Sequence, residues 1–356
     1  MFPVTSPTLA DVARAVGVSR TTVSNAYNRP DQLSGELRNR ILAAAEALGY
    51  PGPDPVARGL RRGRTGLVGL VYDQPLSYLF TDAAILVFVA GMASVWDDAG
   101  MSLALLPRLQ ADDAGASVLA NAAVDGFVSI CDVTDDARLD ALVARGLPFV
   151  MVDHRSSGAR CQVVIDDRGG SRAAAQHLLD LGHRRLAVLA LPRSPGAPGG
   201  TLDPVDPGPI RYTVMADRLA GARDAVAGVG LDWAGVPALA APDDQAPRAA
   251  ARELAGELLD RPDRPTGVVA MSDELAAGVV DAAVARGIDV PGQLSVVGFD
   301  DQPTATSTTP PLTTIHQPLA DRGETAARLL LEGAPAKIVE FPTELVVRGS
   351  TGPAPD

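Results

Sequence analysis

Residues 9–28, LADVARAVGVSRTTVSNAYN, are the most informative stretch of this 356-residue chain. Apolar residues recur at the spacing of one helix face up to Val16. Gly17, which adopts a positive φ at no steric cost, then interrupts the pattern. Ser19 is suited to cap a second helix, whose apolar face carries Val23. The pattern therefore predicts two short helices joined by a tight turn.

This pair of helices fits a helix-turn-helix motif. The motif needs a small residue where the helices cross, here Ala13, and a buried apolar residue on the second helix, here Val23. The second helix then presents polar side chains that can hydrogen-bond base edges and phosphates in the major groove. These are Ser19, Arg20, Thr21, Ser24 and Asn25. The alternative is an ordinary αα corner in a protein that does not bind DNA.

The distribution of charge favours the DNA-binding alternative, although the net charge is −12. Residues 1–64 contain nine arginines and five acidic residues, whereas the rest of the chain contains 22 basic and 38 acidic residues. A basic end on an acidic body is expected when one end contacts a polyanion and the other stays soluble.

The composition is that of a folded protein from a reducing compartment. Apolar residues make up 46% of the chain and charged residues 21%, which is typical of globular domains. Cys131 and Cys161 form no Cys-x-x-Cys pair, and there is no histidine cluster, so we expect inert thiols and no metal or cofactor. The apolar stretch 83–96 is too short to span a bilayer, and the N-terminus lacks the pattern of a signal peptide. We therefore expect a cytoplasmic location and no membrane partner.

Changes in composition divide the chain into three parts. A third helix is expected from about Ser34 to Leu48, so that residues 1–50 form an all-α headpiece. Residues 51–64, rich in proline, glycine and arginine, are interpreted as a linker or as a helix that forms only against a partner. In residues 65–356, continuous apolar runs typical of buried strands alternate with alanine-rich helical segments. This pattern predicts an α/β fold with two parallel sheets.

Several blocks of sequence carry a resemblance to a known family. In the headpiece they are Thr8-Leu-Ala-Asp-Val-Ala, Gly17-Val-Ser, Thr22-Val-Ser and Asn28. In the body they are Val124-Asp-Gly-Phe, the run 177–185, Arg218-Leu-Ala-Gly221, Ser272-Asp-Glu-Leu-Ala-Ala-Gly278, Val297-Gly-Phe-Asp-Asp301 and Pro311-Leu-Thr-Thr-Ile-His-Gln-Pro318. Each block is weak alone, but the ordered set is specific and covers almost the whole chain. The sequence resembles the LacI/GalR family of transcription regulators.

The resemblance implies a dimer that binds a palindromic operator in double-stranded DNA. By this correspondence, Arg20, Thr21 and Asn25 read bases. The phosphate-contacting positions are Thr8, Ser19, Ser24, Asn28, Ser34 and Arg38. Phosphate contacts set the register and supply salt-dependent affinity. Many family members carry arginine where this chain has Asn25, and asparagine prefers adenine where arginine prefers guanine. Their operator preference is therefore not carried over.

Residues 56–62 match the hinge helix of the family. Leu60 holds the position of the apolar wedge that enters the minor groove and bends DNA, and Ala57 lies one turn back on the same face. Gly59 is a poor helix former, so folding of this hinge should depend strongly on DNA. The alternative is that Leu60 is a plain linker residue.

The resemblance further implies a body like the periplasmic sugar-binding proteins, with two α/β lobes and a ligand cleft between them. The N-terminal lobe is expected to cover about 65–166 and 302–325, and the C-terminal lobe about 167–301 and 326–352. Ligands in such folds sit beyond the carboxyl ends of the strands.

Candidate effector contacts lie at these strand ends. Four aspartates follow predicted strands: Asp73, Asp153, Asp273 and Asp300. Carboxylates suit a polyhydroxylated ligand because each accepts two or more hydroxyl hydrogens, although each aspartate has a loop or helix-cap role as its alternative. Tyr72 and Phe80 are placed to stack on a sugar or base face. The family match implies that Arg218 contacts the effector and favours the same role for Asp273, with Arg211 a weaker candidate.

These observations predict a ligand-responsive, sequence-specific DNA-binding regulator, a homodimeric repressor that a sugar or nucleoside-like effector releases. Some members of the family use corepressors, which reverses the sign. A solute-binding protein without a DNA role is the alternative, but it predicts a signal peptide and no basic head. An enzyme is not expected, since the sequence contains no Gly-x-Ser-x-Gly, no phosphate-binding loop of the Walker type and no metal cluster. The loops 73–81 and 192–210 depart from the family pattern, so no known ligand is carried over.

Overall fold

A computed structural model describes residues 7–52, 64–72, 74, 76–80, 82–106, 113–130, 137–155, 161–333 and 335–355. The chain divides into two compact units, Met1–Gly66 and Leu67–Asp356. Among the described residues, no helix is both long and apolar enough to cross a membrane.

The first unit is a small helical domain. Its elements are α1 (Leu9–Val16), α2 (Arg20–Asn28), the 3-10 turn η1 (Pro30–Gln32) and α3 (Gly35–Ala47). Gly17 ends α1 with a φ of 72°, and the Ser19 and Ser34 side chains accept hydrogen bonds from the backbone at the starts of α2 and α3. Val12, Val23 and Ile41, one from each helix, are fully buried together. The three helices therefore begin and end close to where the sequence predicts them.

The linker lies largely outside the described residues. The structure gives no account of residues 53–63, so the hinge-helix prediction, with Ala57 and Leu60, falls outside them.

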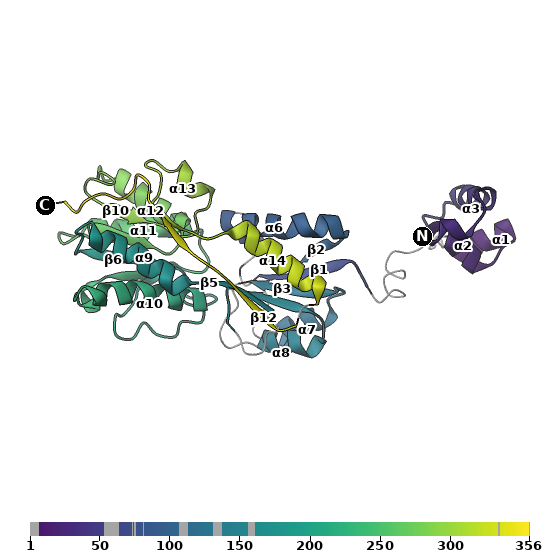
Figure 1. Ribbon diagram of the computed structural model, residues 1–356, viewed down its shortest axis with the longest axis horizontal. Coiled ribbons are helices and arrows are strands. Elements are labelled where there is room, and N and C mark those ends of the chain that lie inside the picture. Colours follow the sequence, from purple (N-terminus) through teal and green to yellow (C-terminus); the bar gives the residue numbers. More distant parts are fainter. Residues whose placement is uncertain are drawn as a thin grey trace, which may run out of the picture. The chain divides into compact units, whose positions relative to one another are not determined.

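The described residues of the second unit form one large sheet in each lobe (Figure 1) and a separate two-stranded pair. The first-lobe sheet has the order β12-β5-β4-β3-β1-β2, and all its pairs are parallel. Its strands are β1 (Leu67–Tyr72), β2 (Ser102–Leu105), β3 (Gly126–Ile130), β4 (Phe149–Val152), β5 (Cys161–Ile165) and β12 (Lys337–Phe341). Its helices are α5 (Leu76–Leu79), α6 (Ala83–Ala99), α7 (Asp113–Asn121), α8 (Ala137–Arg145) and α14 (Leu319–Glu332). Central strands such as β3 are buried along their whole length, as expected when helices cover both faces of a parallel sheet.

The second-lobe sheet has the order β10-β9-β6-β8-β7, parallel except for the edge strand β7. Its strands are β6 (Leu186–Ala190), β7 (Gly200–Thr201), β8 (Ala238–Ala240), β9 (Gly267–Ala270) and β10 (Ser295–Val297). Its helices are α9 (Asp167–Asp180), α10 (Thr213–Gly228), η2 (Trp233–Gly235), α11 (Pro247–Leu259), α12 (Asp273–Val284) and α13 (Pro303–Ser307). A separate antiparallel pair joins β11 (Thr314–His316) to β13 (Glu344–Val346).

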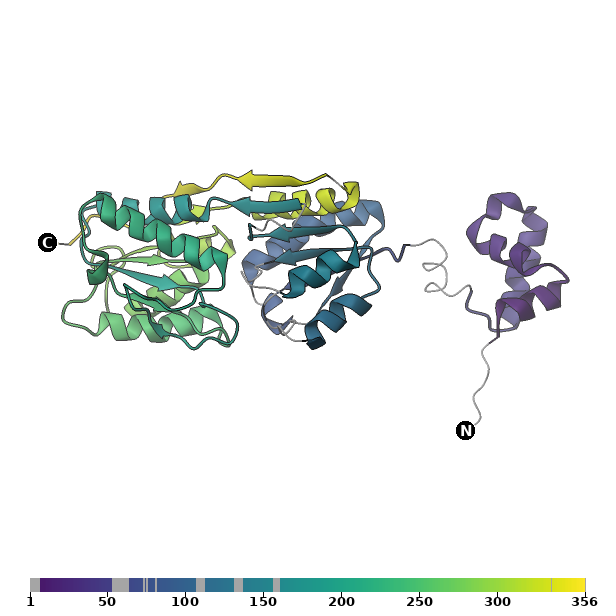
Figure 2. The same cartoon turned by 90° about the horizontal axis from the view of Figure 1, so that it is seen from below.

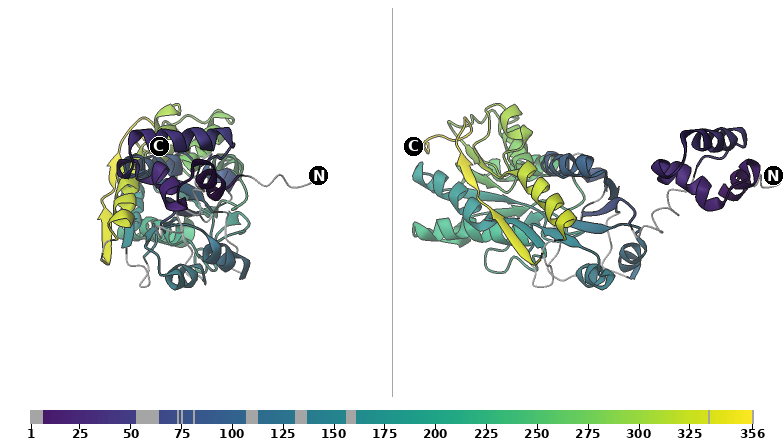
Figure 3. Two further views of the ribbon diagram at one scale, coloured as in Figure 1. Left: turned by 90° about the vertical axis from the view of Figure 1, so that its right-hand side faces the viewer. Right: turned by 45° about the vertical axis from the view of Figure 1, so that its right-hand side comes forward.

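The expected lobe boundaries near the C-terminus are wrong. The segment 302–325 is expected in the first lobe, yet α13 packs on α12 of the second. The segment 326–352 is expected in the second lobe, yet the rest of α14 and β12 belong to the first, because α14 packs on α6 and β12 pairs with β5. Figures 2 and 3 show the last part of the chain, in yellow, running along both lobes. The chain therefore crosses between the lobes three times: after β5, after β11 and after β12.

Close approach through glycine sets the spacing of several helix pairs, and two of them have the shortest backbone distances. A Cβ at Gly323 of α14 would lie 2.1 Å from the carbonyl oxygen of Phe88 in α6. A Cβ at Gly221 of α10 would lie 2.1 Å from the carbonyl oxygen of Arg168 in α9. Only glycine permits these backbone separations, so each residue sets the position of a helix that carries site residues.

Candidate functional site

The exposed start of α2 is the candidate DNA-reading surface. Ser19 caps the helix, with its Oγ 3.0 Å from the amide nitrogen of Thr22. Arg20 and Thr21, in the first turn, are exposed, while Val23 on the opposite face is buried. The helix thus turns its apolar face to α1 and α3 and leaves the first-turn polar side chains accessible.

The other predicted DNA contacts of the headpiece make hydrogen bonds or caps within it. Thr8 caps α1, where its backbone N–H donates to Asp11 Oδ2 over 2.9 Å. Asn25 Nδ2 donates to Gln32 Oε1 over 3.2 Å. Asn28 and Arg38 donate to backbone carbonyls within the headpiece, while Ser24 lies half-buried on α2 and Ser34 caps α3. These bonds fix the side chains without removing them from the surface.

The body contains a cavity at the carboxyl ends of strands from both lobes. Its lining comes from β1, the loop after β4 and α6 on one side, and from α10, α12 and the loops after β8 and β10 on the other. Of the predicted effector contacts, four line it: Tyr72, Asp153, Arg218 and Asp300.

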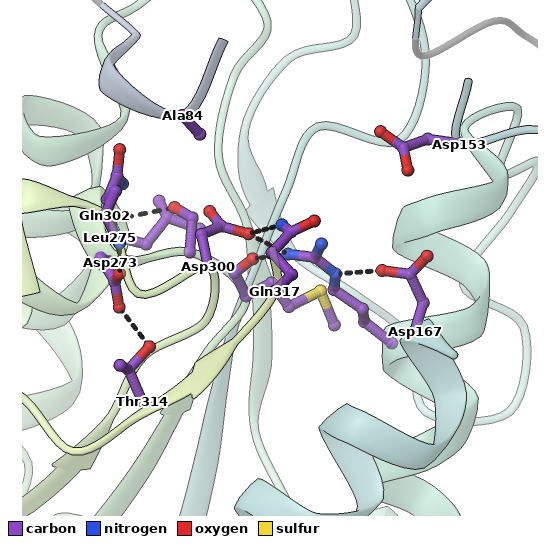
Figure 4. Close-up of polar contacts among 12 residues, drawn as sticks. Ala84, Asp153, Asp167, Asp273, Leu275, Asp300, Gln302, Thr314 and Gln317 are labelled. Carbon is purple, nitrogen blue, oxygen red and sulfur yellow. Dashed lines mark hydrogen bonds and ion pairs between the residues drawn. The ribbon is translucent and has the colours of Figure 1, made fainter. Parts of the chain in front are cut away.

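Arg218 is at the centre of the second-lobe side of the cavity. It is only 5% exposed, and its Nε donates to Asp167 Oδ1 over 2.7 Å. Its Nη1 donates to the Met271 carbonyl oxygen over 2.5 Å and lies 3.4 Å from Asp300 Oδ1. The guanidinium also stacks over the Phe299 ring, with 3.5 Å from Cζ to the centroid. With this many partners the side chain is held in one orientation, and Figure 4 labels two of these partners, Asp167 and Asp300.

Burial dominates the electrostatics of this cluster. Loss of solvation raises the pKa of Asp167 to about 6, against the opposing effect of Arg218. Burial likewise raises the pKa of Asp300 to about 7, again against Arg218. Because these two buried carboxylates share one arginine, the pair can lose a proton near neutral pH.

A chain of polar contacts joins the cluster to the first lobe. Gln317 Nε2 donates to Asp300 Oδ1 over 2.6 Å. Arg322 of α14, only 1% exposed, donates to Gln317 Oε1 and to Asp153 Oδ1. Thr213 Oγ1 donates to the Asp153 carbonyl oxygen across the cleft over 3.0 Å. The polar network therefore runs from one lobe to the other along the wall of the cavity.

The backbone is unusual at two of these aspartates. Asp153 has a φ of 60° and Asp300 a φ of 107°, values that residues other than glycine seldom adopt. Such conformations concentrate at functional sites, where surrounding contacts hold them in place.

Three of the predicted effector contacts are not part of the cavity lining, and Asp73 lies outside the described residues. The Phe80 side chain is 62% exposed, and Arg211 lies in the loop before α10. Asp273 is fully buried, where it accepts hydrogen bonds from Thr314 Oγ1 over 2.5 Å and from the Gln302 amide over 2.9 Å. Its neighbours in the chain, Ser272 and Glu274, line the cavity, whereas the Asp273 carboxylate is held by these two contacts, so an effector role for Asp273 stays a prediction.

Sequence reasoning missed several lining residues: Gln74, Asp82, Asp243, Glu274, Gln302, Gln317 and Arg322. For two of them, Asp82 and Arg322, the sequence itself contained an indication. Asp82 directly precedes the long apolar run of α6 and caps it, accepting from the amides of Ala84 and Ile85. Arg322 interrupts the apolar stripe of α14, at the third position after Leu319 and the fourth before Ala326, where a buried cation needs a partner.

One of the two cysteines lies within the described residues. Cys161 is buried in β5, while Cys131 lies outside the described residues. Within the part of the chain that the structure describes, no three histidine, cysteine or acidic residues are grouped as metal ligands would be.

The headpiece and both parts of the body each match a known protein family. Residues 8–52 match the bacterial regulatory proteins of the lacI family. Residues 65–201 match the periplasmic binding proteins and sugar binding domain of the LacI family, and residues 175–351 match a periplasmic binding protein-like domain. These matches confirm the predicted headpiece and two-lobed α/β body.

The similarity to individual relatives covers nearly the full length of this chain. An HTH-type transcriptional regulator of Mycolicibacterium smegmatis is 40% identical, covering 98% of this chain and 97% of its own. The HTH-type transcriptional regulator IpsA of Corynebacterium glutamicum is 38% identical, covering 95% of this chain and 94% of its own.

Solved structures of LacI-family regulators have the same fold over nearly the whole chain. A LacI-family regulator of Corynebacterium glutamicum has a TM-score of 0.72 at 33% identity, covering 97% of this chain and 98% of its own. The lac repressor dimer bound to operator and an anti-inducer has a TM-score of 0.77 at 25% identity, covering 97% of this chain and 99% of its own. The relatives are named as regulators rather than as enzymes or transport proteins. The chain belongs to the LacI family of bacterial DNA-binding transcriptional regulators.

Proposed function

We propose that this protein is a cytoplasmic, homodimeric repressor that binds a palindromic operator and changes its affinity when a small polyhydroxylated molecule or nucleoside fills the cavity between its lobes. The lac repressor, a structural relative, is a dimer bound to operator. A second relative is a regulator in complex with cellobiose, and a third holds ribose.

The observation that carries the DNA-binding half is the exposed first turn of α2. Arg20 and Thr21 are exposed on a helix whose opposite face is buried, and a helix presented in this way fits the major groove. We assign base reading to Arg20, Thr21 and Asn25. We assign phosphate contacts to Thr8, Ser19, Ser24, Asn28, Ser34 and Arg38, and we keep Leu60 and Ala57 as the proposed minor-groove contacts of the hinge.

Selection from a randomised duplex library tests this half. The full-length protein should enrich an inverted repeat, with a half-site preference that Arg20→Ala relaxes. Arg14→Ala, which removes an exposed charge from α1 instead, is the matched control and should weaken binding without changing the selected sequence. Enrichment of no inverted repeat, or the same relaxed preference in both variants, would refute the assignment.

The effector half rests on the cavity, in which Tyr72, Asp153, Arg218 and Asp300 meet from both lobes. A ligand that contacts both lobes shifts their relative position only by its differential affinity for the two arrangements, and the same free energy couples it to operator affinity. A thermal-shift screen with sugars and nucleosides, followed by operator titration with each hit, identifies the ligand and the sign of its effect. Arg218→Lys keeps a buried cation but not the forked contacts, so it should bind the hit at least tenfold more weakly.

A further inference from the structure

The cavity lining carries an excess of negative charge. Among the described lining residues there are five carboxylates and two guanidinium groups. The carboxylates belong to Asp82, Asp153, Asp243, Glu274 and Asp300, and the guanidinium groups to Arg218 and Arg322. An anionic ligand entering this site would therefore face net repulsion in a poorly solvated space.

Both cations already donate to protein acceptors. Arg218 is held by Asp167, Asp300 and a backbone carbonyl. Arg322 is held by Asp153 and Gln317. The side-chain amides of Gln317 and Gln74 donate to Asp300 and Asp243. The groups that would normally bind a phosphate are therefore engaged with carboxylates.

The N-terminus of α6 offers no substitute. A helix N-terminus is the usual backbone site for an anion, but here Asp82 Oδ1 accepts from the amides of Ala84 (2.9 Å) and Ile85 (3.3 Å). Asp82 therefore brings its own negative charge to the end of α6 that lines the cavity.

The acceptors, in contrast, are not all used. The side-chain oxygen of Gln302 is buried, and within the described part of the chain it has no hydrogen-bond partner. Gln302 is 3% exposed and lines the cavity, and Figure 4 shows it next to Asp273, which accepts from its backbone amide. A buried oxygen left without a donor costs free energy, and a ligand hydroxyl or amino group would satisfy it.

The carboxylates also act on one another across the cavity. Burial raises the pKa of Asp82, and the negative charge of Glu274 raises it further. The charge of Asp82 in turn contributes to the raised pKa of Asp300. Groups on α6, α12 and the loop after β10 therefore face a common space that hydrogen-bond donors would stabilise.

Resting on the proposed function of the cavity as the effector site, we propose that it selects an unphosphorylated, donor-rich polyol and rejects anionic ligands such as sugar phosphates and nucleotides. The ligand's hydroxyls donate to Gln302 Oε1 and to the carboxylates of Asp82 and Glu274. An ammonium group in place of one of these hydroxyls keeps or strengthens binding, because it adds a charge-assisted hydrogen bond.

Matched ligand series test the selection on the full-length protein. Each series contains a sugar or cyclitol, the same skeleton with one amino group, and its phosphate ester, and nucleosides are paired with their monophosphates. Thermal shift and calorimetry should show binding by at least one unphosphorylated polyol, and a loss of at least about tenfold on adding the phosphate. A phosphate ester or nucleotide that binds as tightly as its parent, or a panel in which no polyol binds, overturns the proposal.

Two variants connect the result to the named residues. Glu274→Gln should weaken polyol binding about tenfold and reduce discrimination against the phosphate, whereas Glu257→Gln, an exposed carboxylate in the same lobe, should change neither. Gln302→Leu should weaken binding without lowering the melting temperature, since the lost oxygen has no protein partner. Unchanged affinity in both cavity variants would contradict the assignment of the contacts.

The experiments distinguish a failure of the proposed ligand selectivity from a failure of the proposed regulatory function. If a phosphorylated ligand binds and alters operator affinity, the selectivity is wrong but the cavity is still the effector site. If an unphosphorylated polyol binds in the cavity and operator affinity does not respond, the selectivity holds and the regulatory role fails.

Discussion

The same substitution at two glycines of α10 should change stability in opposite directions. At Gly221, an alanine Cβ would lie 2.1 Å from the carbonyl oxygen of Arg168, whereas ordinary contacts begin near 3.4 Å. Helices α9 and α10 would have to separate by roughly 1 Å, and overpacking of this kind costs about 1–3 kcal/mol. At Gly228, the last residue of the same helix, a Cβ would meet nothing within 4 Å.

Gly228→Ala should therefore stabilise the body by about 0.5–1 kcal/mol through reduced backbone entropy in the unfolded chain. Gly221→Ala gains the same amount but loses more to the forced separation, for a net cost of about 1–2 kcal/mol. Urea denaturation followed by far-ultraviolet circular dichroism measures both. A gain in stability for Gly221→Ala would show that the helix pair is not held at the close distance that we describe.

The comparison also has a functional readout. Arg218 lies one turn before Gly221 on α10, and its ion pair with Asp167 spans the gap to α9 at 2.7 Å. Gly221→Ala should thus weaken effector binding in calorimetry, while Gly228→Ala should leave it unchanged. Equal affinities in the two variants would mean that helix spacing does not control the position of Arg218.

Three further outcomes are expected. Arg322→Met should cost about 3–5 kcal/mol in urea denaturation because it leaves Asp153 uncompensated, and adding Asp153→Asn should recover most of it; a double variant no better than the single would contradict the pairing. Burial raises the pKa of Asp300 from 3.8 to about 7, so the folded protein binds this proton more tightly than the unfolded chain, and the contribution of Asp300 to stability falls as pH rises from about 4 to 7. The melting temperature of Asp300→Asn should therefore fall less over this range than that of the unaltered protein. Parallel melting profiles of the two proteins would contradict the raised pKa. Ser19→Ala removes the cap of α2 and should cost about 1 kcal/mol locally, seen as faster hydrogen exchange of the α2 amides with no change in the melting of the body; unchanged exchange would refute a capping role.

The headpiece could be predicted closely because its signals are local. Gly17 ends one helix and Ser19 and Ser34 begin the next two, each through contacts within three or four residues. The buried strands of the body were likewise visible as continuous apolar runs.

What the sequence did not reveal depends on contacts between distant residues. The pairing of β12 with β5 joins residues about 175 positions apart, and no local pattern near Lys337 indicates it. The family resemblance favours an effector contact at Asp273, but the direction of its side chain is set by Thr314 and the loop at Gln302. Ser272 and Glu274, on either side, face the ligand space instead.

The late return of the chain to the first lobe has a consequence for biosynthesis. β1 to β5 leave the ribosome early, yet the edge strand and the helix that finish their sheet, β12 and α14, are made only after almost all of the second lobe. Until then the nascent chain exposes apolar surface of β3, β4 and β5 that α14 will cover, and such surface makes a partly synthesised protein prone to aggregation. Ribosome-bound chains that end before residue 319 should therefore hold a loosely ordered first lobe and engage chaperones until the last tenth of the protein emerges.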